Sequence, residues 1–214
     1  MKLSPTPYAL SLFLFALFSA WPLSSHAADI TGNVTLNLPL IDWKTEHALG
    51  RRTAPVLAIL YSDYQCPFCR IEQARMRSFY RKNRTKVLWI FRHYPLPFHD
   101  NAMPAAEAAE CAGSLNGNTA FWQFTDAIFE GTGNFDFPSI AKRLGIDAPA
   151  FRKCMNDHTM TVHIEAERDA GAAAGVSGTP TLFLLNKKTG QGEMVIGAQD
   201  LAVLQNTLDK LLAK

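Results

Sequence analysis

The chain has 214 residues, and its 21 basic and 19 acidic residues give a formal net charge of +2. Because the two signs are mixed along the sequence, the charge pattern does not favour a nucleic-acid surface, and we expect no nucleic-acid partner. We expect partners to be recognised by shape and apolar contact instead.

The first 27 residues have the pattern of a cleaved secretory signal peptide. Lys2 precedes an apolar stretch from Tyr8 to Trp21, and small residues surround the expected cleavage site before Ala28. The apolar stretch is shorter than the roughly 20 residues that a spanning helix needs, so we expect no stable membrane insertion. The pattern predicts export to an oxidising compartment, and its bacterial appearance indicates the periplasm.

The predicted mature chain has about 187 residues, enough for one domain or for one domain interrupted by a second small one. Alternating apolar residues over 34–40 predict an edge strand, because Pro39 cannot donate to a ladder. The apolar runs 56–61 and 87–91 predict strands, and the second has the continuous apolar character of a buried strand. A helix predicted over 71–81 connects them, which makes the unit a parallel crossover.

The second half of the chain is predicted to be mainly helical from Asp100 to Ala174, followed by two strands and a closing helix. The strands are expected at 181–185 and 193–196, with a turn between them, and the leucines of the last helix share one face. Segments containing turn-forming residues interrupt the long helical stretch at three places: 116–117, 131–133 and 145–149.

Two cysteines separated by two residues, in the sequence Cys66-Pro67-Phe68-Cys69, form the most informative motif. Such a pair can be a zinc half-site, a haem attachment site, a structural disulfide or a redox pair. Here an apolar strand ends just before the pair and a helix begins just after it. This context is typical of a thioredoxin-like redox motif.

The position of Cys66 at the start of a helix predicts its chemistry. Pro67 suits the first helical position, so the free N–H groups and the positive end of the helix face the Cys66 sulfur and favour its thiolate. We therefore predict that Cys66 exchanges with substrate. Cys69, one turn inside the helix, is expected to be less accessible and to close the intramolecular disulfide.

The downstream segment Val176-Ser177-Gly178-Thr179-Pro180 is a candidate cis-proline loop. Pro180 precedes a predicted strand, and a cis X-Pro bond is usually a deliberate feature of a tight turn. The alternative is an ordinary trans turn proline. Isomer state is not encoded locally, so the expectation of a cis bond depends on the position of the loop.

Three segments together resemble the bacterial DsbA-family thioredoxin-fold oxidoreductases. They are 61–69, the segment 91–99 and Gly178-Thr179-Pro180-Thr181, and the resemblance covers nearly the whole predicted mature chain. It implies an α/β, thioredoxin-like fold with an inserted helical domain and a periplasmic enzyme that makes, breaks or shuffles disulfides. It also implies that Thr179 and Pro180 lie beside the exchanging sulfur and pair with substrate backbone.

The motif departs from the strong oxidases of that family in two places. Those oxidases carry a histidine where this chain has Phe68, and the phenyl ring offers the thiolate no charge partner, which predicts a milder oxidising drive. They also carry a buried acid where this chain has Leu60. Asp63, which matches isomerase and reductase relatives, is a candidate proton relay or a solvated turn residue. His93 and His99 are candidates for acid-base groups or for residues that hold loop backbone.

The other two cysteines, Cys111 and Cys154, both lie in the predicted helical stretch. With Cys66 and Cys69 assigned to the redox site, they are the natural structural disulfide of an exported protein. A zinc site is disfavoured because zinc usually takes two closely spaced cysteine pairs, and we predict no metal site.

These observations define a sequence-based hypothesis. We expect a signal peptide (1–27), a thioredoxin-like domain in two parts (28–98 and 158–214) and an inserted helical domain (99–157). The predicted activity is dithiol-disulfide exchange on cysteine-containing secreted proteins, with no cofactor beyond the cysteines and with a membrane redox partner, either a quinone-linked oxidase or a thiol-reducing protein.

Oxidation is the favoured direction, because the segment between Ala28 and Ala54 is too short for the separate dimerisation domain that isomerases of this superfamily carry. An isomerase or reductase is the alternative, motivated by Phe68, Asp63 and Thr179. A copper-binding or chaperone module that uses Cys66 and Cys69 as soft ligands is a third possibility, disfavoured because no methionine or histidine cluster accompanies them.

Overall fold

The computed structural model describes residues 32–34, 41–131, 133 and 135–213. The predicted signal peptide and residues 35–40 of the predicted first strand lie outside the described residues. The strands are β1 (Gly32–Val34), β2 (His47–Leu49), β3 (Val56–Ser62), β4 (Val87–His93), β5 (Thr181–Asn186) and β6 (Gly192–Ile196). The helices are α1 (Pro67–Asn83), α2 (Ala102–Glu130), α3 (Phe137–Arg143), α4 (Ala148–Asn156), α5 (Thr161–Ala173) and α6 (Leu201–Leu212).

The strands form one mixed sheet in the order β1-β6-β5-β3-β4-β2. The pair β3 and β4 is parallel with α1 as its crossover, and β5 and β6 form an antiparallel hairpin, so both predicted units are confirmed. The sequence did not predict β2, which pairs antiparallel with the outer edge of β4. Its three half-buried residues are too few to show a strand period.

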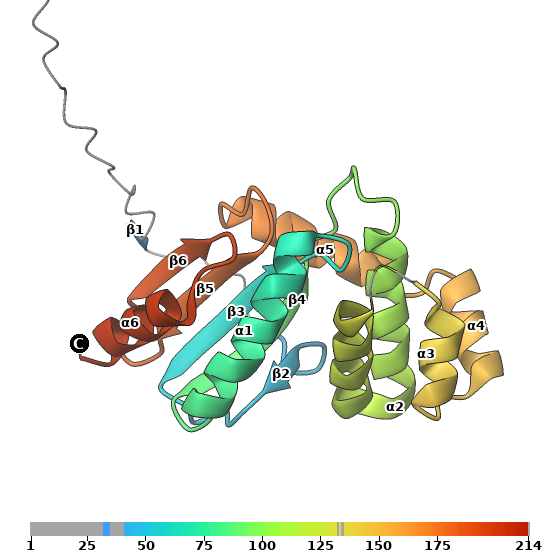
Figure 1. Cartoon of the computed structure of the whole chain (residues 1–214), viewed down its shortest axis with the longest axis horizontal. Helices are drawn as coiled ribbons and strands as arrows, with labels where there is room; N and C mark the ends of the chain where they lie inside the picture. Colours follow the sequence, from blue (N-terminus) through green and yellow to red (C-terminus); the bar gives the residue numbers. More distant parts are fainter. Residues whose placement is uncertain (1–31, 35–40, 132, 134, 214) are drawn as a thin grey trace, which may run out of the picture.

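Side chains of the central strands alternate between two cores, as the two-residue period of a strand requires. On one face of β3, Val56, Ala58 and Leu60 join a large core with residues of α1, α2 and α6. On the other face, Leu57 and Ile59 join a smaller core. Figure 1 shows α1 and α6 in front of the sheet and α5 behind it.

Close approach of α5 to the sheet depends on Gly171. A Cβ at this position would lie 2.7 Å from Cε1 of Tyr61 and 3.1 Å from Cδ2 of Tyr94. The first distance is shorter than real Cβ contacts and the second is tighter than most of them, so a side chain here would require the helix or the two tyrosine rings to shift. The glycine therefore fixes how closely the back layer packs.

Helices α2 to α5 lie between β4 and β5 in the chain, where the sequence predicted a helical stretch. Figure 1 shows α2, α3 and α4 gathered beside the sheet. The predicted break at 116–117 is a kink inside α2, where Gly117 has a φ of 80° and a ψ of 179°. The sequence missed the break between α4 and α5, where His158 has a positive φ of 49°. The domain limits at 99 and 157 stay a prediction.

A disulfide joins Cys111 of α2 to Cys154 of α4, the pair that the sequence proposed. The Cα atoms lie 5.9 Å apart, within the usual range for a disulfide, and 43 positions separate the two residues in the chain. Among the helices that the structure describes, none combines the length and apolar character that a membrane span requires.

We predict that replacing Cys111 and Cys154 with alanine, in a Cys66→Ala/Cys69→Ala background, lowers the free energy of unfolding by about 2–4 kcal/mol. The chain-entropy model gives about 4 kcal/mol for a loop of this length. Chemical denaturation followed by circular dichroism measures the difference, and the background protein with its bridge intact is the matched control. A difference below about 1 kcal/mol would contradict a stabilising role for the bridge.

Candidate active site

The two closely spaced cysteines lie at the junction between β3 and α1, as predicted. Cys66 is the N-cap of α1 with extended backbone (φ −68°, ψ 122°), and Pro67 follows it in the first turn. The Cys66 carbonyl accepts hydrogen bonds from the backbone N–H groups of Cys69 (3.1 Å) and Arg70 (3.3 Å), which close that turn. The Cys66 sulfur therefore lies at the positive end of the helix dipole.

The loop before β5 packs against this junction. The carbonyl oxygen of Thr179 lies 3.5 Å from Cys66 Sγ, although 113 positions separate the two residues. The Thr179–Pro180 peptide bond is cis. The Pro180 carbonyl accepts a hydrogen bond from Gly197 (2.8 Å), which ties the loop to the end of β6. The structure thus brings together Cys66, Thr179 and Pro180.

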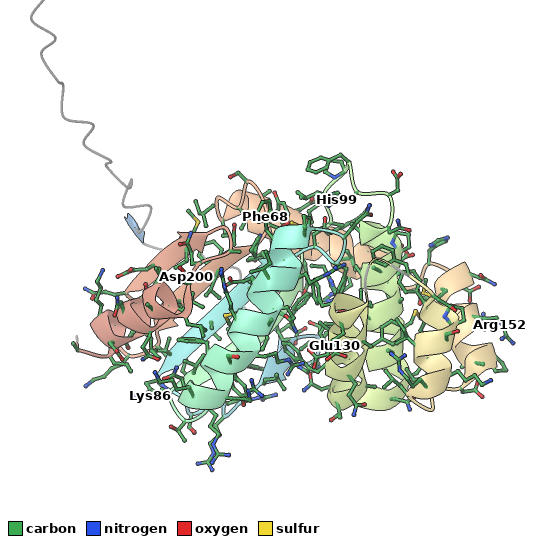
Figure 2. All side chains as sticks on the ribbon, viewed as in Figure 1. Phe68, Lys86, His99, Glu130, Arg152 and Asp200 are labelled. Atoms are coloured by element: carbon green, nitrogen blue, oxygen red, sulfur yellow. A yellow bond between two sulfur atoms is a disulfide. The ribbon has the colours of Figure 1, made fainter. Side chains whose placement is uncertain are left out.

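The two cysteines differ in accessibility in the predicted order. Cys66 is 5% exposed and Cys69 is fully buried. Cys66 is thus the less buried of the two sulfurs, although little of it is exposed. Phe68 is by contrast 60% exposed, and Figure 2 shows it at the N-terminal end of α1.

The environment shifts the pKa values of the two thiols in opposite directions. The pKa of Cys66 is lowered to about 5, chiefly because the Cys69 thiol donates a hydrogen bond to the Cys66 thiolate. Backbone N–H groups at the helix start add to this effect, and burial opposes it. Burial raises the pKa of Cys69 well above its ordinary value, and its hydrogen bond to Cys66 raises it further. Cys66 is therefore the thiolate and Cys69 the thiol at neutral pH.

Asp63 is a buried positioning residue, so the interpretation as a solvated turn residue is wrong. It is 1% exposed, and its carboxylate accepts hydrogen bonds from the backbone N–H groups of Gln65 (2.7 Å), Cys66 (3.2 Å) and Leu96 (2.9 Å). Its own backbone N–H lies 3.4 Å from Cys69 Sγ. These contacts fix the turn that carries the cysteines, and a role as proton relay stays a prediction.

Neither candidate histidine forms a hydrogen bond with a cysteine. His99 Nδ1 lies 2.8 Å from an Asp63 carboxylate oxygen, so this ring supports the turn through Asp63. His93 is buried, and its Nε2 lies 2.8 Å from a carboxylate oxygen of Glu110 in α2. Burial lowers the pKa of His93, which favours the neutral ring. Both rings contact carboxylates and not loop backbone, so the second sequence-based interpretation is not borne out in that form, and a role as acid-base group stays a prediction.

Glu72 is a buried acid that the sequence analysis missed. It lies three residues after Cys69 on the inner face of α1 and is 1% exposed. One carboxylate oxygen accepts a hydrogen bond from the Gln199 backbone (3.2 Å), and burial raises the pKa of Glu72 to about 7. Glu72 shares the helix face of the buried residues Cys69, Met76 and Phe79. This helical spacing is the sequence signal that could have revealed it.

The aromatic residue Phe98 was also missed. It is 72% exposed, and its ring packs edge-to-face on His99, with ring centroids 4.7 Å apart. His99 in turn contacts Asp63, so Phe98 lies on the same loop that supports the cysteine turn. Within the described ranges, no group of three or more His, Cys, Asp and Glu residues is arranged to bind a metal ion.

A thiol pair at a strand-to-helix junction, with split pKa values and a cis-proline loop against the outer sulfur, defines a thioredoxin-type thiol-disulfide oxidoreductase site. Residues 42–210 match the family model described as thioredoxin. The chain belongs to this family.

Solved structures agree with this assignment and confirm the predicted α/β, thioredoxin-like fold of the DsbA family. The chain is similar to DsbA2 from Pseudomonas aeruginosa, with 28% identity, a TM-score of 0.67 and coverage of 81% of this chain and 96% of that one. It is similar to the thiol-disulfide exchange protein alpha-DsbA2 from Wolbachia pipientis, with 26% identity, a TM-score of 0.66 and coverage of 78% and 87%. BdbD from Bacillus subtilis, with 21% identity, a TM-score of 0.71 and coverage of 86% and 100%, shares the fold.

Two further proteins that are similar to this chain are named as Na(+)/H(+) antiporters. The chain is 34% identical to Na(+)/H(+) antiporter NhaA 1 of Salinispora arenicola over 80% of its own length, and 33% identical to NhaA 3 of Salinispora tropica over 81%. It covers 26% of each of those proteins. The similarity therefore concerns about a quarter of each antiporter sequence.

We predict that the thiolate absorbance of the reduced protein disappears as the pH falls through about 5, because Cys66 is then protonated. Cys69→Ala should raise this midpoint, since the largest cause of the lowered pKa is the hydrogen bond from Cys69. Cys69→Ser is the matched control, because its hydroxyl can still donate, and its midpoint should rise less. Equal midpoints in the two variants would show that the Cys69 hydrogen bond does not lower the pKa.

Proposed function

We propose that this chain is an exported oxidase of protein thiols, which introduces disulfides into secreted or periplasmic proteins through Cys66 and Cys69. The observation that carries the proposal is the opposite shift of the two thiol pKa values beside the Thr179 carbonyl. A thiolate with a low pKa is a good leaving group, so the reduced form of the site is favoured. A site that is stable when reduced is a strong acceptor of electrons from substrate thiols.

The chemistry starts from the oxidised site, in which Cys66 and Cys69 share a disulfide. A substrate thiolate attacks Cys66 Sγ, the bond between the two site sulfurs breaks, and Cys69 leaves as a thiolate that takes up a proton. A second substrate thiolate then attacks the substrate sulfur of the mixed disulfide and releases the Cys66 thiolate. The substrate loses two electrons and gains a disulfide, and the site gains the two electrons.

The residues around Cys66 have different roles in these exchange steps. Pro67 and the first turn of α1 direct backbone N–H groups toward the departing Cys66 sulfur. Asp63 holds the turn, and the cis-proline loop of Thr179 and Pro180 puts the Thr179 carbonyl beside the sulfur, where an extended substrate would pair. The exposed ring of Phe68 lies where substrate approaches and gives apolar contact area.

Repeated turnover requires an acceptor for the two electrons. We infer a membrane redox partner of the quinone-linked type, and we infer the periplasm as the compartment, because the first 27 residues have the signal-peptide pattern. A thiol-reducing partner would instead keep the site reduced and direct it toward isomerisation or reduction. One observation favours this alternative. The pKa of Cys66 is lowered by hydrogen bonds and not by a neighbouring cation.

We predict that Cys69→Ser forms stable mixed disulfides with substrate proteins, whereas Cys66→Ser forms none. Cys66 carries the less buried sulfur and the one with the lowered pKa, and without the Cys69 thiol the mixed disulfide is not resolved within the site. Non-reducing gel electrophoresis after incubation with an oxidised, cysteine-containing protein measures the adducts. Adducts on Cys66→Ser, or none on Cys69→Ser, would reverse the assignment of attacking and resolving cysteines.

We predict that the oxidised protein restores activity to a reduced multi-cysteine substrate faster than the reduced protein rescues the same substrate with scrambled disulfides. Both assays follow recovered substrate activity, with the Cys66→Ala/Cys69→Ala variant as control. Rescue of scrambled substrate at the rate of oxidation would replace the oxidase proposal with the isomerase. A measured reduction potential close to that of thioredoxin would replace it with the reductase.

A further inference from the structure

A cavity of about 700 Å³ lies between α1 and α2, on the side of α1 away from α6. Its walls include residues of α1 from Arg70 to Arg81, the end of α2 at Asp126–Glu130, and Leu49 of β2. Figure 2 shows Glu130 on α2 beside α1. The volume falls in the range of ligand-binding clefts, and none of the catalytic steps above uses this space.

The cavity follows the face of α1 that begins at Cys66. Arg70, Gln73, Arg77 and Arg81 are spaced by three or four residues, so they lie in one row along the helix. Counting back one turn from Arg70 leads to Cys66. A polypeptide whose cysteine is bonded to Cys66 can therefore extend along this row without crossing the helix.

The charges in the cavity favour an acidic ligand. Arg77 is paired with Asp126, and its guanidinium lies over the rings of Trp89 (5.4 Å) and Trp122 (5.0 Å), so it is fixed in place. Two further arginines, Arg70 and Arg81, are exposed, and among the described residues neither forms an ion pair. Glu130 is the carboxylate in the cavity that opposes them.

A buried acceptor in the cavity wall lacks a protein partner. Gln73 is 3% exposed, and its Nε2 donates to Asp126 Oδ1 (3.0 Å), which fixes the orientation of the amide. Its Oε1 is buried and has no hydrogen-bond partner among the described residues. This oxygen is closed off from solvent, so the amide holds Asp126 in place and does not contact a ligand. The half-buried side chain of Leu49 supplies apolar surface in the cavity.

We propose that this groove between α1 and α2 binds an acidic segment of the substrate polypeptide next to its reactive cysteine. The proposal rests on the proposed function, since it concerns the same substrates. Acidic side chains pair with the exposed Arg70 and Arg81, and an apolar side chain packs on Leu49. The groove would thereby favour substrates with carboxylates at set distances from the cysteine.

The helix geometry gives these distances. A rise of about 1.5 Å per residue puts Arg70 about 6 Å and Arg81 about 22 Å along α1 from Cys66. An extended substrate advances about 3.3 Å per residue, so the acidic residues should lie about two and about seven positions from the cysteine.

The test uses peptides in which serine replaces the reactive cysteine, so that binding is measured without exchange. One pair of peptides carries glutamate at the second and seventh positions after the serine, or glutamine at both, and a second pair places these residues before it. Fluorescence anisotropy at low salt should show that a glutamate peptide binds the full-length protein about fivefold more tightly than its glutamine counterpart. High salt should remove the preference.

Two groove variants and a charge-matched control decide the outcome. R70E/R81E should abolish the preference, and E130K, which removes the opposing carboxylate, should increase it. R152E/K188E changes the net charge equally at exposed positions outside the cavity and should keep the preference. Circular dichroism verifies folding, and E130K tests the groove even if R70E/R81E fails to fold.

Equal binding of the glutamate and glutamine peptides in both arrangements, or equal losses in R70E/R81E and R152E/K188E, would overturn the proposal. Failure of the proposed function has a separate signature. In that case cysteine-containing peptides would not exchange with Cys66, whatever their charge, while the binding of the serine peptides would still report on the groove.

Discussion

The hydrogen bonds that the buried Asp63 carboxylate accepts hold the whole site together. They tie the turn at Cys66 to the loop after β4 at Leu96, and His99 supports the carboxylate from that loop. A buried carboxylate is costly unless it is hydrogen-bonded, so each of these donors helps to keep the charge in the fold. The position of Cys66 at the N-cap of α1 follows from this arrangement, and the accessibility and pKa of both thiols follow from that position.

Asymmetry between two chemically identical side chains is the basis of the site. The Cys66 thiolate accepts hydrogen bonds from Cys69 and from the start of α1, whereas Cys69 is enclosed in apolar surroundings that disfavour charge. No neighbouring cation is required for this difference, because helix geometry and burial are enough. Phe68 is consequently free to contribute apolar contact surface at the point where substrate approaches.

The helical block supports the sheet and forms one wall of the cavity beside α1. Its disulfide joins α2 to α4, apart from the redox pair at the start of α1, so the two pairs of cysteines have separate tasks. Glu110 of α2 contacts both His93 of β4 (2.8 Å) and His47 of β2 (3.0 Å), which attaches the block to the sheet through buried polar contacts. Because α2 is held in this way, its far end forms a fixed wall of the groove beside α1.

Local patterns in the amino-acid sequence predicted the central elements of this fold and the motif of its site. The apolar runs predicted the central strands β3 and β4 and the hairpin of β5 and β6, and the Cys66-Pro67-Phe68-Cys69 motif predicted the strand-to-helix site. These features depend on residues that are close together in the chain, and the periodicity of those residues is visible in the sequence. The resemblance to the DsbA family supplied the expectation that Thr179 and Pro180 meet Cys66.

The groups that complete the site come from distant parts of the chain, and packing of the fold selects them. Burial of Asp63 depends on Leu96 and His99, the lowered pKa of Cys66 depends on how deeply Cys69 is enclosed, and β2 forms because β4 offers it an edge. The groove beside α1 likewise requires the end of α2 to stand opposite Arg70 and Arg81. Such contacts join segments that are far apart in the chain, and no local pattern encodes them, because their energy comes from packing and exclusion of water across elements.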